Sequence, residues 1–121
     1  MEENTFRYRG VDFPYLPKSV QLQRERKLAR LFSPVSGPVV QDMGFLPAVI
    51  TGEGELFGPE AGGQLRSIRE LFEAPGKGLL QIPGQPALWA YFSGLSVSQR
   101  AGPQVIRYRF TFLEDGGGPW S

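Results

Sequence analysis

Glycine and proline interrupt this sequence far more often than they interrupt an average globular chain. The 121 residues include 16 glycines and 11 prolines, a combined share well above the usual value of about 12%. Proline ends a helix and glycine weakens one, so little of the sequence can form long helices. We therefore exclude an all-α bundle. We expect short strands joined by turns around a single core, because a chain of this length suffices for one domain.

Two residue types that carry much of enzyme chemistry are missing. The sequence has no cysteine and no histidine, which excludes disulfides, thiolate metal sites, cysteine nucleophiles and histidine-based triads. No phosphate-binding motif and no calcium-loop spacing is present. We predict a non-enzymatic protein without catalytic residues, metal or cofactor. A small hydrolase that uses a pair of carboxylates is the enzymatic alternative.

Charge is balanced overall but uneven along the chain. The formal net charge is +1, so we expect neither a membrane nor a nucleic acid as a specific ligand. Residues 18–30 carry five basic side chains against Glu25 alone, whereas residues 42–60 carry four acidic side chains and no base. These stretches are either solvated surface or opposite patches that join copies of the chain or bind partners. The candidate interface residues are Arg24, Arg26, Lys27, Arg30, Asp42, Glu53 and Glu55.

Residues 63–74 have the pattern of an amphipathic helix. Four apolar side chains fall on one stripe, and charged side chains occupy the opposite face. Pro75 and Gly76 end the helix. We expect the stripe to pack against a sheet as part of the core. It consists of Leu65, Ile68, Leu71 and Phe72.

Residues 19–32 fit neither standard pattern. Their composition favours a helix, but arginines interrupt the apolar face of a helix and of a strand alike. A long strand that leaves the sheet halfway would explain the mixture. Pro34, Gly37 and Pro38 then mark a hairpin tip, followed by a short return strand over residues 39–42. We predict a protruding hairpin arm over residues 19–42, with strand and helix both open for 19–32.

The rest of the sequence reads as short strands and turns. Gly52 and Gly54 are expected at a bulge or turn. The fold class is therefore mainly β: an antiparallel barrel or sandwich over residues 1–115, with one flanking helix and the arm. A Gly-rich tail or linker start follows at 116–121. The expected segments are an opening hairpin over 5–15, strands over 45–58 and 79–83, and a strand pair over 87–100 and 104–115.

Arginine and aromatic residues alternate on the first and last expected strands. This alternation occurs on strands that bind single-stranded nucleic acid, so a β-barrel that binds peptide or nucleic acid is an alternative function. It also arises on any strand with one face in the core and one in water, and the near-neutral charge favours that reading. The residues are Arg7, Arg9, Arg107 and Arg109 with Phe6, Tyr8, Tyr108 and Phe110.

Four stretches in order resemble a known family. They are the aromatic–Arg–Gly opening (6–13), the Val-x-Asp-x-Gly element (38–44), the run Glu-Ala-Pro-Gly-Lys-Gly-Leu-Leu-Gln-Ile-Pro (73–83) and the closing Phe-Thr-Phe-Leu-Glu (110–114). Together they resemble the DNA-circularisation N-terminal domain family of phage tail and baseplate proteins. No residue supports the DNA chemistry in that name.

The resemblance implies a structural subunit rather than an enzyme. Its implied fold is that of distal-tail and tail-tube domains, which are β-barrels or sandwiches with one helix that assemble into rings. Its implied place is the baseplate or tube end of a phage or phage-like contractile tail. The implied partners are further copies of the chain and tail tube, hub or spike proteins. Assembly in the host bacterial cytoplasm would be followed by residence in the virion tail. Some related proteins carry a peptidoglycan-binding module after such a domain.

Overall fold

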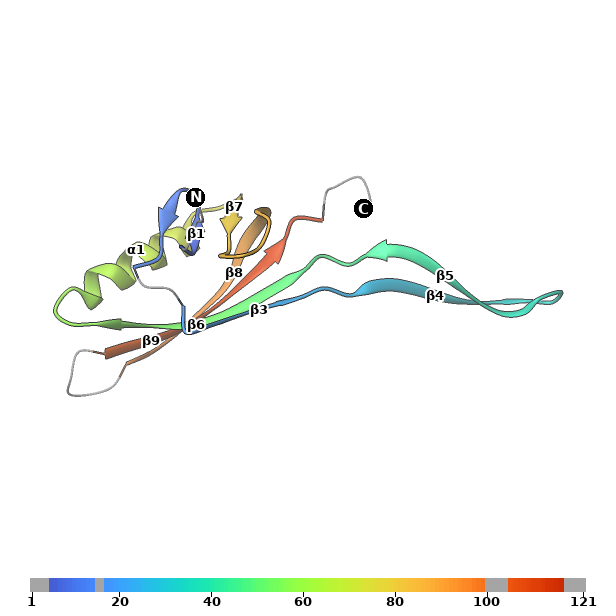
Figure 1. The fold of residues 1–121 in the computed structure, drawn as a ribbon, viewed down its shortest axis with the longest axis horizontal. Coiled ribbons are helices and arrows are strands. Elements are labelled where there is room, and N and C mark those ends of the chain that lie inside the picture. The colour runs from blue at the N-terminus through green and yellow to red at the C-terminus, as the bar shows by residue number, and fades with distance from the viewer. Residues whose placement is uncertain (1–4, 15–16, 100–104, 117–121) are drawn as a thin grey trace.

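The structure, a computed structural model, describes residues 5–14, 17–99 and 105–116. Within these ranges the chain forms nine strands and one helix (Figure 1). The connection between the expected strands 87–100 and 104–115, and the tail beyond 116, lie outside the described residues. In chain order the elements are β1 (Arg7–Tyr8), β2 (Val11–Asp12), β3 (Ser19–Gln23), β4 (Arg26–Ser33), β5 (Gly37–Phe45), β6 (Val49–Phe57), α1 (Ala61–Glu73), β7 (Lys77–Gln81), β8 (Leu88–Gln99) and β9 (Val105–Glu114).

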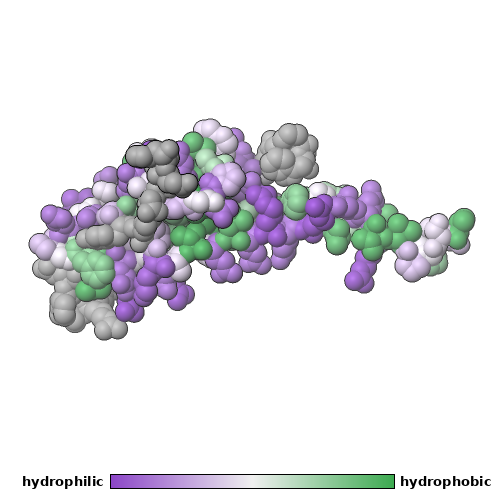
Figure 2. Space-filling view, in the orientation of Figure 1, coloured by the Kyte–Doolittle hydropathy of each residue, from purple (hydrophilic) through white to green (hydrophobic). Residues whose placement is uncertain are grey.

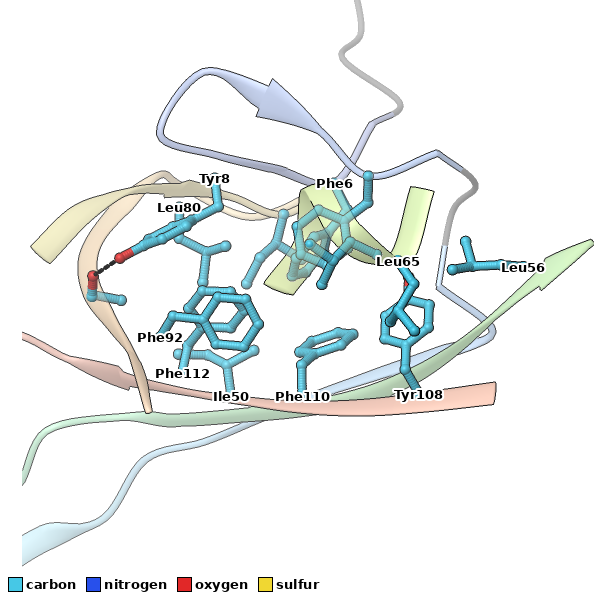
Figure 3. Close-up of a cluster of buried hydrophobic side chains, with 14 of the residues drawn as sticks. Phe6, Tyr8, Ile50, Leu56, Leu65, Leu80, Phe92, Tyr108, Phe110 and Phe112 are labelled. Carbon is cyan, nitrogen blue, oxygen red and sulfur yellow. Dashed lines mark hydrogen bonds between the residues drawn. The ribbon is translucent and has the colours of Figure 1, made fainter. Parts of the chain in front are cut away.

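Seven strands form one antiparallel sheet in the order β2-β1-β7-β8-β9-β6-β3, and β4 and β5 form a separate two-stranded sheet. The large sheet ends in β2 and β3 and does not close into a barrel. It curls so that β1 and β7 lie opposite β9, with the core between them (Figure 3). The predicted class, mainly β with one flanking helix and a protruding hairpin, is confirmed in its sandwich-like form.

Aromatic side chains dominate the core (Figure 3). The Phe92 and Phe112 rings stack with centroids 4.4 Å apart, and Phe112 also meets Tyr8 edge-on at 4.8 Å. The buried Tyr8 hydroxyl donates a hydrogen bond to the Ala90 carbonyl at 3.0 Å. Alternate residues of β9 point into this cluster, as expected for a strand with one buried face.

The helix lies where its apolar stripe predicts. Helix α1 begins two residues before the expected start and ends at Glu73, ahead of Pro75. Leu65 and Ile68 are buried, while Leu71 and Phe72 are partly buried against the core. The stripe is therefore core packing, and it fixes the helix on the inner face of the sheet.

The expected bulge or turn at Gly52 and Gly54 is wrong. Strand β6 pairs with β9 without a register shift across both glycines. A Cβ at Gly52 would lie 2.5 Å from the Phe110 ring, and one at Gly54 would lie 2.6 Å from the Tyr108 hydroxyl. The glycines therefore let two core rings cross the β6 backbone. The register shift occurs instead in β8, between Phe92 and Gly94.

The ambiguous segment 19–32 forms two strands. Its first part, β3, pairs with β6 at the edge of the large sheet, and its second part, β4, leaves the sheet and pairs with β5. The strand that leaves the sheet halfway is confirmed, and the helix alternative is wrong. The return strand is longer than expected, because β5 runs from Gly37 to Phe45.

Candidate assembly interface

Residues 26–45, called the arm from here on, project from the body of the molecule (Figure 1). Strands β4 and β5 pair only with each other in the described structure. Figure 2 shows apolar side chains along the arm as far as its tip. Phe32 is 75% exposed, Val40 is 62% exposed and Val35, in the tip, is 95% exposed. The arm thus holds large apolar side chains in water.

Both faces of the arm carry apolar groups. Residues paired across the two strands share a face, and successive residues alternate between faces. The face that carries Arg30 is called the arginine face. It consists of Leu28, Arg30, Phe32, Pro38, Val40 and Asp42; the opposite face includes Ala29, Leu31, Val39 and Gln41. An isolated two-stranded hairpin is only marginally stable in water, so the arm gains little stability from its own pairing.

Arg24 fixes the arm to the body. Its guanidinium lies 2.8 Å from a carboxylate oxygen of Glu114, which is only 8% exposed. The Ala48 amide donates to the same carboxylate at 3.0 Å. The one buried acid of the described residues is therefore paired and hydrogen-bonded, as burial of a charge requires.

A second set of contacts holds the beginning of the arm. The Arg26 guanidinium lies over the Phe45 ring at 4.3 Å and forms an ion pair with Asp42. A hydrogen bond from the Gly44 amide, together with Arg26, lowers the pKa of the Asp42 carboxyl below its ordinary value. The Leu46 amide donates to the Glu25 carbonyl at 2.8 Å. These contacts hold the two strands of the arm together where they leave the body.

The basic and acidic stretches meet inside one chain. Arg26 pairs with Asp42, and Lys18 lies 3.5 Å from Glu55. Glu55 also lies 2.9 Å from the Arg107 guanidinium. Glu53 faces Arg109 at 3.6 Å in the same way. Part of the opposite charge is thus satisfied within the molecule.

The seven candidate interface residues fall into three groups. Arg24, Arg26 and Asp42 form the contacts at the start of the arm, while Glu53 and Glu55 lie on the large sheet. Lys27 and Arg30 extend from β4, and among the described residues neither forms an ion pair. A role for any of the seven between chains remains a prediction.

Sequence reasoning missed the apolar side chains that the arm exposes. It took the candidate interface residues of this segment from their charge alone. The signal was present, because Leu28 and Phe32 share a strand face with Arg30, so this face is not fully apolar. Apolar residues that do not fit a buried face of a helix or strand are candidates for an interface with another chain.

The rings of the arginine–aromatic strands are not available to stack on bases. Phe6, Tyr8, Tyr108 and Phe110 are all about 1% exposed. Burial raises the pKa of Tyr108 to about 12. Stacking on nucleic acid needs accessible rings, so these strands follow the pattern of one face in the core and one in water.

The described residues contain no group of three or more Asp, Glu, His or Cys that could hold a metal ion. Glu53 and Glu55 each face an arginine, so they form no isolated carboxylate pair. No helix in the described ranges is long and apolar enough to cross a bilayer.

Comparison with known proteins shows similarity in fold. No family model and no curated protein matches the sequence, so the resemblance to the DNA-circularisation family finds no support there. The crystal structure of Dit from phage SPP1, described as a paradigm of the hub adsorption apparatus in phages that infect Gram-positive bacteria, is similar with a TM-score of 0.66 at 13% identity. The alignment covers 93% of this chain and 49% of that one, so this chain spans about half the length of Dit.

Two structures of gene transfer agent particles are also similar. One is the native virion and the other is the tail of the empty particle with C6 symmetry. Each has a TM-score of 0.55 at 10% identity over 84% of this chain, and the alignments cover 81% and 78% of those chains. The fold is therefore one that tail particles use.

Proposed function

We propose that this chain is a non-enzymatic structural subunit of a phage or phage-like tail. Its position in the proposal is the baseplate or tube end, where it contacts further copies of itself and tail tube, hub or spike proteins. It assembles in the host bacterial cytoplasm and then resides in the tail of the particle. The fold shared with the SPP1 and gene transfer agent proteins supports the class.

The arm is the observation that carries the proposal. It presents apolar side chains on both faces, and contacts at its start hold it away from the body. Monomeric proteins rarely keep extended apolar surfaces in water, and such surfaces mark interfaces. A projecting two-stranded arm with this composition suits a subunit that contacts a neighbour.

Assembly of the purified chain tests the proposal. Light scattering coupled to gel filtration and negative-stain microscopy should show rings or stacked tubes at high concentration. Substitution of Phe32→Ser and Val35→Ser together should leave the melting temperature unchanged and leave the chain monomeric. Phe57→Ser is the matched control, because Phe57 is 46% exposed on the large sheet, and it should assemble normally.

Two results count against the proposal. One is a wild-type chain that stays monomeric at every concentration and does not bind to tail particles. The other is normal assembly by the Phe32→Ser/Val35→Ser variant, which would remove the arm from the mechanism.

A further inference from the structure

The outer face of the large sheet, which points away from the core, has an apolar patch at one end. In the register, Val49 pairs with Leu113, and Leu113 pairs with Tyr91 on the next strand. Trp89 lies two residues before Tyr91 on the same face. All four side chains are exposed, Trp89 by 54% and Tyr91 by 41%. Because directly paired residues lie about 5 Å apart, these four form one surface, called the outer apolar patch.

The middle of the outer face is polar, whereas Phe57 is exposed at the end away from the patch. Thr51, Glu53 and Glu55 on β6 face Thr111, Arg109 and Arg107 on β9, with the ion pairs described above. An antiparallel sheet with one face in water carries polar groups there. The middle of the sheet follows this rule and the outer apolar patch departs from it, which marks the patch as a surface for a partner.

Charged groups border the patch on both sides. On one side Lys77, which pairs with Tyr91 in the register, lies 2.7 Å from Asp115. On the other side Gln23 pairs with Val49 in the register, and its amide donates to the Glu25 carboxylate at 3.4 Å. Glu25 forms no ion pair within the described part of the chain. The patch is thus apolar with an acid at its edge that is open to a cation.

The arginine face of the arm has complementary chemistry. It joins three exposed apolar side chains, Leu28, Phe32 and Val40, to Arg30, which has no ion pair among the described residues. The arm of the same chain is held away from the body where Arg24, just before the arm, pairs with Glu114 of β9. It cannot fold back without breaking this pair, so an arm that covers the patch must come from another copy.

We propose that the arginine face of one copy's arm docks on the outer apolar patch of a second copy, with Arg30 beside Glu25. This inference rests on the proposed function and names the surface through which the copies join. Such a contact is heterologous, with arm on one side and patch on the other, so it closes into a ring when the rotation between copies permits. Apolar contact provides the attraction and the Arg30–Glu25 pair sets the register.

Disulfide trapping tests the contact directly, because the natural chain has no cysteine. One chain carries Val40→Cys on the arm and a second, mass-tagged chain carries Tyr91→Cys on the patch. Mixed and oxidised under conditions of assembly, they should form a heterodimeric cross-link. The control pairs Val40→Cys with Phe57→Cys, which is exposed to a similar degree on the same sheet, and should form none.

A charge exchange tests the pairing of Arg30 with Glu25. Arg30→Glu alone and Glu25→Arg alone should each raise the concentration at half assembly by about tenfold or more, since like charges then face each other. The double variant should return it to within about threefold of wild type. Arg66→Glu on the exposed side of α1 changes the net charge equally and should have no effect. Melting temperatures of all variants show whether each monomer still folds.

The outcomes separate this inference from the proposed function. Assemblies that form without a Val40–Tyr91 cross-link, or with equal cross-linking to Phe57→Cys, overturn the docking site and leave the structural role intact. Cross-linking of the patch to a different tail protein also overturns it, by naming another occupant. Failure of the double variant to recover overturns the Arg30–Glu25 pairing. A chain that never assembles overturns both proposals.

Discussion

At the scale of single residues, the contacts of Arg9 explain the glycine at position 78. Arg9 has a positive φ of 55°, and its guanidinium donates to the Pro75 carbonyl at 2.6 Å and the Lys77 carbonyl at 3.2 Å. Its aliphatic part lies across Gly78, where a Cβ would come within 2.3 Å of the Arg9 Cγ. The opening hairpin is thereby tied to the turn between α1 and β7.

Gly78→Ala should therefore lower the free energy of unfolding by about 1–3 kcal/mol, the usual cost of overpacking a filled site. Gly63→Ala is the matched control, because nothing lies within 4 Å of a Cβ there, and alanine should stabilise the helix by about 0.5–1 kcal/mol. Urea denaturation measures both. Equal effects at the two glycines would contradict this role for Arg9.

Asp42 should titrate at low pH. The hydrogen bond from Gly44 and the ion pair with Arg26 hold its pKa below the ordinary value of 3.8. The Asp42 carboxyl has a lower pKa in the folded chain than in the unfolded chain. The ionised carboxylate therefore stabilises the folded state fully when the pH is above the unfolded pKa, and this stabilisation is lost as the pH falls through the folded pKa. NMR titration of the carboxyl should show this, with the Gly44 amide following the same midpoint. A midpoint at or above 3.8 would contradict the geometry.

At the scale of elements, the helix was predictable because its signal is local. The apolar stripe and the Pro75-Gly76 stop lie within one short stretch of sequence. The tip of the arm was predictable for the same reason, from Pro34, Gly37 and Pro38. The unbroken course of β6 was not, because the need for Gly52 depends on Phe110, which is distant in sequence.

Within α1, alanine substitutions of Ile68 and Leu71 should differ in their effect on the free energy of unfolding, although both residues belong to the same apolar stripe in the sequence. Ile68 is 1% exposed, whereas Leu71 is only partly buried. Ile68→Ala should lower the free energy of unfolding by about 2–5 kcal/mol, and Leu71→Ala should cost less. Thermal and urea unfolding give the comparison, and a loss under about 1 kcal/mol for Ile68→Ala would show that the helix is not docked on the sheet.

The candidate interface was predictable only in part. Local charge located the basic arm, but it could not show that Arg24 meets Glu114, 90 residues further along the chain. Nor could it show that Lys18 and Arg107 share Glu55. The pairing of strands that are distant in sequence determines which charged side chains form ion pairs within the chain. This pairing cannot be inferred from one sequence.

Reversal of two arm-region arginines should therefore give different results. Arg24→Glu places a second carboxylate against the buried Glu114 and should lower the free energy of unfolding by about 1–3 kcal/mol. Arg30→Glu, on the exposed arm, should leave it unchanged while weakening assembly. Unfolding and assembly are measured on both variants. Equal monomer stability for the two would show that Arg24 does not anchor the arm.

At the scale of the whole molecule, the chain combines a body that has a packed core with an arm that is only marginally stable on its own. The aromatic core and α1 stabilise the body, while no residue of the arm belongs to that core. Such a structure suits a subunit whose body folds on its own before the arm binds to a larger particle. In the proposed assembly, the outer apolar patch of each copy binds the arm of a neighbouring copy.

Amide hydrogen exchange of residues 26–45, compared between the monomeric and the assembled chain, tests this account most directly. In the monomer the arm amides should exchange far faster than those of α1, because few contacts protect a two-stranded sheet. In the assembly the arm amides should slow by about a hundredfold or more, with those of α1 unchanged. Arm amides that exchange equally fast in both states would contradict the claim that the arm is an assembly device.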